Sequence, residues 1–158
     1  SDLRPHYENN PYSHASVIYH VQNRIKAIRN TVAIGIRSMD ITEKKFLATE
    51  STFFAHDIHQ SADWMPKALS QIQSPVYITF DLDVFDSSLM PATGTPEPGG
   101  LFWHQVLPFL KLVAESRQII GFDVIELAPI KNFPAPNFLA AKLIYKLLNY
   151  IFKNAEKR

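Results

Sequence analysis

Along the chain, short apolar runs alternate with segments in which apolar residues recur every three or four positions. This pattern predicts strands separated by helices. Strands are predicted at short β-branched or aromatic runs, which are typical of buried strands. These runs cover residues 31–36, 76–80 and 118–125, with a weaker run at 52–55. Helices are predicted where apolar residues recur every three or four positions. They cover residues 13–28, 61–72, 103–115 and 137–152, with a short helix from Thr42 to about residue 50.

The starts of three predicted helices carry their own signals. Ser13 and Thr42 are candidate N-caps, because a hydroxyl oxygen can accept a backbone N–H at a helix start. The apolar stripe of the first helix consists of Val17, Val21, Ile25 and Ile28. Ser61 is expected to begin a further helix, in which Pro66 falls near the first turn, where proline is tolerated.

This order of elements predicts an α/β protein with a mainly parallel sheet and helices on both faces. Ligands of such sheets bind beyond the carboxyl ends of the strands. Arg37, Asp81 and Glu126 stand at predicted strand ends, and Asp2 stands where a further strand would have ended. No repeat, low-complexity segment or linker is visible, so a single domain is predicted over residues 1–158.

Composition narrows the class of protein. The 158 residues carry a net charge of +1, with 46% hydrophobic and 20% charged residues, which is typical of a globular protein. The basic residues are scattered, which argues against nucleic acid as a partner, and no apolar run is long enough to span a membrane. The absence of cysteine excludes disulfides and thiolate chemistry. These features agree with a cytoplasmic protein.

The segment at residues 77–101 carries the strongest chemical signal. The strand predicted at residues 76–80 delivers Asp81 and Asp83 to its carboxyl end, and a loop rich in proline, glycine and threonine follows. Two carboxylates at this spacing suit a hard or borderline divalent metal, which prefers oxygen ligands. An Asp pair can also form a turn or a helix cap, but long loops between core elements are usually functional. Asp86 is expected to hold this loop rather than a metal.

The residues FDLDVFDSSLMPATGTPEPGG resemble the signature of the ureohydrolase superfamily, which contains arginase and agmatinase. SDLRPHYENNPYSHAS, GIRSMD and GFDVIELAP resemble further segments of this family in the expected order. The resemblance covers nearly the whole chain and implies a three-layer α/β/α sandwich. The family's first metal motif, Asp-Ala-His-x-Asp, is matched only in its last two positions, and its upstream Gly-Gly-Asp-His motif has no counterpart. We therefore expect a C-terminal portion of a ureohydrolase, with the N-terminal part of the fold and three of six metal ligands absent.

The resemblance implies a site for two manganese ions. Asp81 would bridge both metals, Asp83 would bind one, and Asp2 would bind one and orient a bridging hydroxide. That hydroxide would attack the guanidinium carbon of the substrate and release urea and an amine. Asp2 could instead be a solvated residue of a frayed terminus.

The resemblance also gives roles to four residues that do not bind metal. His14 would move protons towards the departing amine. Glu126 would be catalytic and would bind the guanidinium through two hydrogen bonds. Thr95 would help to hold the guanidinium, and Asp40 falls where arginases contact the substrate's α-amino group. Judged by residue type alone, these side chains could equally be surface, capping, ion-paired or loop-packing residues. Asp123, which strand alternation turns away from Glu126, is expected to be structural.

Agmatine is the favoured substrate, and its hydrolysis would give urea and putrescine for polyamine biosynthesis. The stretch LRPHYENNPYSHAS resembles the agmatinase loop more than the arginase loop that grips an amino-acid carboxylate. Arginase, guanidinobutyrase and formimidoylglutamase activities are alternatives. The expected partners are a small guanidino substrate and, for a complete chain, further copies in a trimer or hexamer.

Two other functions fit parts of the sequence. Haloacid-dehalogenase phosphatases also contain a hydrophobic strand ending in Asp-x-Asp, but near their N-terminus and without the GTPEPGG that follows here. The chain could also be an inactive fragment or an interaction module with sticky strand edges. We expect the isolated chain to be inactive, and activity to return only with the missing half.

Overall fold

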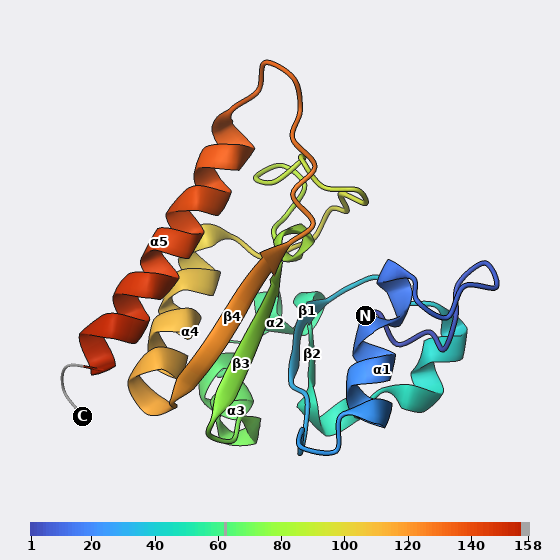
Figure 1. The fold of residues 1–158 in the computed structure, drawn as a ribbon. Coiled ribbons are helices and arrows are strands. Elements are labelled where there is room, and N and C mark those ends of the chain that lie inside the picture. Colours follow the sequence, from blue (N-terminus) through green and yellow to red (C-terminus); the bar gives the residue numbers. More distant parts are fainter. Residues whose placement is uncertain (62, 156–158) are drawn as a thin grey trace. The chain divides into compact units, whose positions relative to one another are not determined.

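The chain forms two compact units of α/β structure, Ser1–Ile72 and Gln73–Arg158 (Figure 1). A computed structural model describes residues 1–61 and 63–155. Within these residues each unit contains one pair of parallel strands. The predicted α/β class with parallel strands is therefore confirmed, and a single domain over residues 1–158 stays a prediction.

The first unit is built on the strands β1 (Ala33–Ile36) and β2 (Thr52–Phe54), which pair in parallel. Its α-helices are α1 (Val17–Arg24), α2 (Ala55–Gln60) and α3 (Trp64–Gln71). Short 3-10 helices cover His14–Ser16, Ile41–Phe46 and Thr49–Ser51. Ala55 and Ile58 of α2 are buried, as are Trp64 and Ala68 of α3. The small core of this unit therefore includes side chains of α2, a helix that the apolar spacing did not predict.

The first helix is shorter than its apolar spacing predicts. It ends at Arg24 rather than at residue 28, and it buries none of its side chains. Val17 and Ile25 of the predicted stripe are 51% and 47% exposed. Short helices draw most of their stability from packing an apolar face. Because this stripe lacks such packing, the helix stops after two turns.

Ser13 does stand at the N-cap of the 3-10 helix His14–Ser16, but neither predicted cap makes the expected side-chain bond. The Ser13 side chain makes no capping bond, and its Oγ lies 3.0 Å from Oγ of Ser16. The 3-10 helix Ile41–Phe46 is capped by Asp40, whose carboxylate accepts the Thr42 N–H, so Thr42 is the capped residue rather than the cap. The helix expected from Ser61 begins at Trp64. Pro66 lies in its first turn, as predicted.

The second unit matches the predicted elements closely. The strands β3 (Val76–Asp81) and β4 (Ile119–Ile125) pair in parallel, and Asp81 stands opposite Ile125 at the end of the ladder. The helices α4 (Trp103–Ser116) and α5 (Ala135–Ala155) run alongside this pair (Figure 1). Buried residues of the two helices form the core, namely Val106, Phe109, Leu110 and Val113 of α4 with Ala140, Leu143 and Leu147 of α5.

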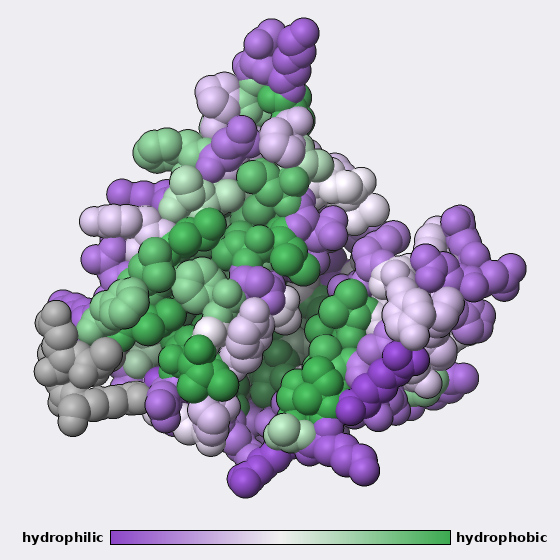
Figure 2. Space-filling view, in the orientation of Figure 1, coloured by the Kyte–Doolittle hydropathy of each residue, from purple (hydrophilic) through white to green (hydrophobic). Residues whose placement is uncertain are grey.

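The helix α5 is apolar on a second side as well. Phe138, Tyr145 and Phe152, spaced by seven residues, are 72%, 60% and 63% exposed. Figure 2 shows hydrophobic residues gathered on the surface of this region. Despite this apolar character, no described helix has the combination of length and hydropathy that a membrane span needs.

Candidate functional site

Four of the predicted site residues meet at the carboxyl end of the β3–β4 pair. Asp81 is the last residue of β3, and Glu126 directly follows β4. Asp83 lies in the one-turn 3-10 helix that follows β3. Thr95 comes from the following loop, and its hydroxyl donates to Oδ2 of Asp83 at 3.4 Å. Three carboxylates and a hydroxyl therefore line one edge of the second unit, at the place where ligands of parallel sheets bind.

The Asp81 and Asp83 carboxylates are held by a local turn. Oδ1 of Asp81 accepts the backbone N–H of Asp83 at 3.0 Å and so caps the 3-10 helix Leu82–Val84. Leu82 between them is fully buried, which anchors the turn in the core. Asp81 therefore does form the cap that was an alternative to metal binding. This cap uses Oδ1 of Asp81.

Glu126 has an unusual backbone conformation. Its φ is +66°, in the left-handed region that costs a non-glycine residue about 1–2 kcal/mol. Its carboxylate oxygen Oε2 lies 3.6 Å from the position that a Cβ on Gly94 would take. The left-handed turn thus brings the Glu126 side chain against the loop that carries Thr95. Backbone strain of this kind often gathers at functional sites.

The loop at residues 86–100 is closed at its base and packed on itself. Its ends meet in a parallel β-bridge between Phe85 and Leu101, in which the Asp86 N–H donates to the Leu101 carbonyl at 3.0 Å. Met90 and Ala92 inside the loop are almost completely buried. A loop with close ends and its own packed interior is an Ω-loop, a type that is frequently functional.

The Asp86 carboxylate holds this loop, as the sequence suggested. Its Oδ1 accepts the Ser88 N–H at 2.9 Å and the Ser88 hydroxyl at 2.5 Å. Its Oδ2 accepts the N–H groups of Gly99 and Gly100 at 2.7 and 3.2 Å. The Ser88 hydroxyl bond, followed by the backbone bonds, lowers the pKa of Asp86 to about 2.

This lowered pKa predicts an acid-dependent loss of stability. A carboxyl group with a depressed native pKa stabilises the fold fully above its unfolded pKa of about 4. That contribution is lost as the pH falls through the native value of about 2. Asp86→Asn should therefore flatten the stability profile between pH 4 and pH 2. Urea unfolding of both proteins at several pH values measures this, and parallel profiles would contradict it.

Three predicted site residues belong to the first unit. Asp2 has a left-handed φ of +58°, and its carbonyl accepts the Tyr19 N–H at 3.1 Å. His14 is exposed, and its ring meets that of Tyr7 edge-on at 5.8 Å. Asp40 accepts both the N–H and the hydroxyl of Thr42, and these bonds lower its pKa. The Asp40 carboxylate thus has a capping role, whether or not it also contacts a substrate.

Glu43 is a residue of this unit that the motif reasoning missed. It is 2% exposed, and its two oxygens accept the N–H groups of Leu3 at 2.8 Å and Asp40 at 2.6 Å. The guanidinium of Arg4 lies 3.9 Å from the same carboxylate. Glu43 thereby ties the segment after Asp2 to the Asp40 turn. The spacing of Asp40 and Glu43 is that of a capping box, and this signal could have revealed it.

Replacing Glu43 by glutamine should destabilise the chain. The two N–H groups bond to different oxygens of Glu43, and glutamine keeps only one of these oxygens. One donor therefore loses its acceptor, which costs about 1–3 kcal/mol. Glu50→Gln removes an exposed acid in the same unit and should change the free energy of unfolding by less than about 0.5 kcal/mol. Urea unfolding of the two variants checks this, and equal stabilities would show that the Glu43 bonds contribute little.

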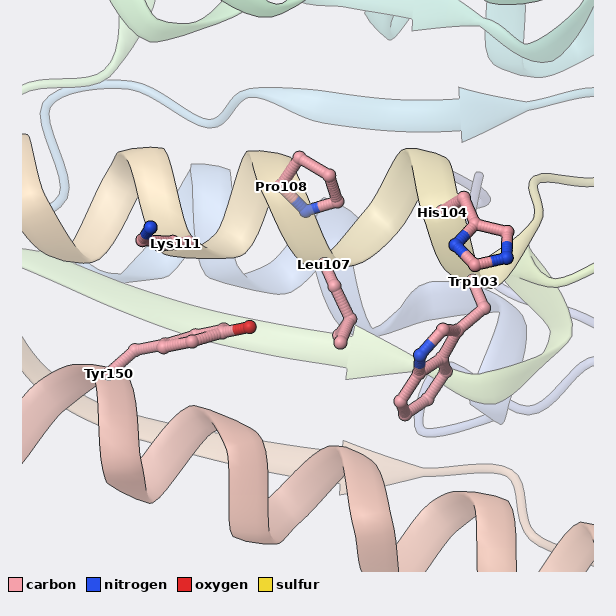
Figure 3. Close-up of a pocket in the computed structure, with 6 residues that line it drawn as sticks. All are labelled: Trp103, His104, Leu107, Pro108, Lys111 and Tyr150. Carbon is pink, nitrogen blue, oxygen red and sulfur yellow. The ribbon is translucent and has the colours of Figure 1, made fainter.

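Two grooves are lined by none of the four residues at the β3–β4 edge. One, of about 350 Å³, lies between α4 and α5 and contains none of the predicted site residues; its lining is Trp103, His104, Leu107, Pro108, Lys111 and Tyr150 (Figure 3). Figure 3 shows Tyr150 reaching from α5 towards α4. The other, of about 420 Å³ in the first unit, is lined by Asp40 and by the segment from Arg4 to Glu8. The second groove is therefore lined by a predicted substrate-binding residue, Asp40.

The chemistry of the β3–β4 edge suits a divalent metal in part. Asp81 and Asp83 supply carboxylate oxygens, the ligands that manganese and magnesium prefer. Within the described residues, no group of three or more His, Cys, Asp or Glu side chains gathers into a metal-binding cluster. The two aspartates therefore fit two ligand positions, and a full coordination shell requires further ligands.

Comparisons with known proteins place these features in a family. The profile of the Arginase family matches residues 1–149, so the chain belongs to the arginase family. An N(1)-aminopropylagmatine ureohydrolase of Synechocystis is 33% identical over 99% of the chain, and one of Thermococcus kodakarensis is 38% identical over 91%. An agmatinase of Pyrococcus horikoshii is 33% identical over 93%. The chain spans about half the length of these relatives, namely 51%, 49% and 51%.

Solved structures share the fold. Proclavaminate amidinohydrolase from Streptomyces clavuligerus superposes with a TM-score of 0.85 at 28% identity, covering 98% of this chain and 54% of that one. The agmatine ureohydrolase of Thermoplasma volcanium gives a TM-score of 0.83 at 27% identity, covering 100% of this chain and 54% of that one. The predicted arginase-like α/β fold and the predicted family are therefore both confirmed.

Proposed function

We propose that the chain is the part of a ureohydrolase that binds a guanidino amine and contributes metal ligands for its hydrolysis to urea and an amine. The observation that carries this proposal is the meeting of Asp81, Asp83, Thr95 and Glu126 at one strand edge. Membership of the arginase family supports it. The relatives named above are ureohydrolases and an agmatinase, which act on guanidino compounds by name.

The residues divide this work by their chemistry. Asp81 and Asp83 would hold manganese, with Asp2 as a further ligand. A bound divalent metal would supply a water molecule activated at neutral pH. Glu126 would bind and orient the guanidinium, because a carboxylate and a guanidinium form two parallel hydrogen bonds. Its position against Gly94 would keep it close to Thr95 and Asp83.

The first unit would handle protons and the rest of the substrate. His14 would carry a proton towards the departing amine, because imidazole titrates near neutral pH. Asp40, on the wall of the groove with Glu8 and Tyr7, would attract an amino group of the substrate. Proton transfer and the choice of substrate would thus belong to residues distant in sequence from the two metal-binding aspartates.

The proposed substrate is agmatine or a larger amine built on agmatine, and it carries no α-carboxylate. Agmatine was favoured by the loop before His14, and N(1)-aminopropylagmatine is agmatine extended by one aminopropyl group. Several relatives carry the name of the second activity. The complete enzyme would be a cytoplasmic homo-oligomer, and its activity would need the length that the relatives have beyond this chain.

A chimeric enzyme tests the proposal. This chain would replace the matching half of the Thermococcus kodakarensis ureohydrolase, to which it is 38% identical. Urea release with manganese would be measured for agmatine, N(1)-aminopropylagmatine and arginine. We expect release from the first two substrates, at least about tenfold faster than from arginine. Little or no release is expected from the isolated chain.

The control for this experiment is the folded state of the chimera. Circular dichroism and gel filtration would establish that it folds and assembles like the parent enzyme. A folded chimera that releases no urea from any of the three substrates would contradict the proposed function. Preference for arginine would contradict the proposed substrate class while leaving the reaction in place.

A further inference from the structure

We propose that Asp86 is a positioning residue. Its carboxylate fixes the shape of the loop at residues 86–100, which connects the ends of β3 and β4 and which we call the staple. The staple would set the position of Glu126 relative to Asp83. Its catalytic meaning rests on the proposed function, whereas the staple itself follows from the contacts of the second unit alone.

The base of the staple is tied to the end of β3. The Leu101 N–H donates to the Val84 carbonyl at 2.8 Å, and the Asp86 N–H donates back to the Leu101 carbonyl at 3.0 Å. Phe85 and Leu101 are each 1% exposed, so this junction lies in the core. The loop therefore leaves and re-enters the fold at one rigid point.

The Asp86 carboxylate joins the two arms of the loop just above this base. Ser88 belongs to the outgoing arm, and Gly99 and Gly100 belong to the returning arm. One side chain thus accepts four hydrogen bonds from both arms, two on each oxygen. Charge-assisted bonds of this kind are roughly twice as strong as neutral ones. The carboxylate supplies all of the acceptors, so an amide at this position cannot replace it.

The middle of the loop reaches the ends of both strands. The Thr95 hydroxyl donates to Asp83, which follows β3. On the other side, the Ala128 N–H donates to the Ala92 carbonyl at 2.8 Å, two residues after Glu126. Glu126 lies beyond the last paired residue of β4, so the β3–β4 ladder does not hold it. The bond from Ala128 to Ala92 ties the stretch after β4 to the loop.

The staple predicts an effect of Asp86 on the distant Ala128 amide, which a purely local role of Asp86 does not predict. If Asp86 only stabilised its own turn, its loss would loosen Ser88, Gly99 and Gly100 alone. If it sets the shape of the whole loop, its loss must also loosen the Ala128 amide, which is 42 residues further along the chain. Hydrogen exchange at single amides separates these two cases.

The experiment compares amide hydrogen exchange by NMR in the 158-residue chain and in its Asp86→Asn variant. We expect exchange at Gly99, Gly100 and Ala128 to become at least about tenfold faster in the variant. Amides within the β3–β4 ladder should change by less than about twofold. Glu115→Gln, which removes an exposed acid of α4, is the matched control and should change none of these amides. Unchanged exchange at Ala128 would overturn the proposal.

A second variant covers the case in which Asp86→Asn loosens the whole unit. Ser88→Ala removes the hydroxyl donor and leaves the bonds to Gly99 and Gly100 in place. Exchange at Ala128 should then rise by about two- to fivefold with the ladder unchanged. The proposal would be overturned if exchange of the β3–β4 ladder amides rose equally, or if exchange at Ala128 did not change. Because exchange is measured without substrate or metal, an Ala128 response with an inactive chimera would refute the proposed function and leave the staple standing.

Discussion

Asp83→Asn is expected to lower manganese-dependent urea release of the chimeric enzyme by at least about 100-fold. The substitution keeps the size of the side chain but removes the charge and one of the two oxygen ligands. Losing even a residue that only supports a ligand typically costs 10–100-fold in metal affinity or activity. A lost ligand should cost at least as much. The measurement is urea release at increasing manganese concentration, together with manganese affinity from calorimetry.

The matched control for this prediction is Asp123→Asn. Asp123 lies on β4 of the same unit, where it accepts the Thr79 hydroxyl at 2.8 Å. Its hydrogen bond to the Tyr77 hydroxyl raises the pKa of Tyr77. These contacts agree with the structural role that its strand position suggested, so urea release should change by less than about threefold. Similar losses in the two variants would show that Asp83 has no special role in metal binding.

Gly100→Ala is expected to be the most destabilising single methyl addition in the loop. A Cβ at this position would lie 2.5 Å from the Asp86 nitrogen and from the Phe85 carbonyl carbon. Both atoms belong to the buried bridge between Phe85 and Leu101, which cannot move without breaking the base of the loop. Overpacking typically costs about 1–3 kcal/mol, and a clash with rigid backbone atoms should fall at the upper end of that range. Urea unfolding monitored by tryptophan fluorescence would report it through Trp103, which stacks on Phe85.

Two other glycines of the loop provide controls. At Gly94 an added Cβ would be 3.6 Å from its nearest neighbour, the Glu126 carboxylate, so Gly94→Ala should cost less than about 1 kcal/mol. Gly99 has space for a methyl group but a φ of +78°, so Gly99→Ala should cost about 1–2 kcal/mol. A cost for Gly100→Ala no larger than that for Gly94→Ala would mean that the loop base is not rigid.

The elements of the second unit could be predicted because their signals are local. Residues 76–80 and 118–125 are β-branched runs, and the observed strands end within one residue of those bounds. The helix α4 begins at Trp103, as its apolar spacing predicted. Strand ends then fix where Asp81 and Glu126 lie, because neighbouring parallel strands present their carboxyl ends at the same edge.

The first unit was predicted less well because its elements depend on packing. The stripe of Val17, Val21 and Ile25 has helical spacing, yet the helix ends at Arg24 because the unit does not bury that stripe. The helix α2 is only six residues long, too short for a period to show. Its burial of Ala55 and Ile58, rather than its pattern, holds it in place.

By itself the sequence determined the fold class, the family and the strand-end carboxylates, since each depends on residues close together in the chain. The tertiary structure alone decided which backbone groups, distant in sequence, meet the Asp86 and Glu43 carboxylates and the loop at residues 86–100. The four donors on Asp86, the bond from Ala128 to Ala92 and the burial of Glu43 join segments up to 40 residues apart. Such bonds depend on where the chain returns in space, and local propensity does not determine this.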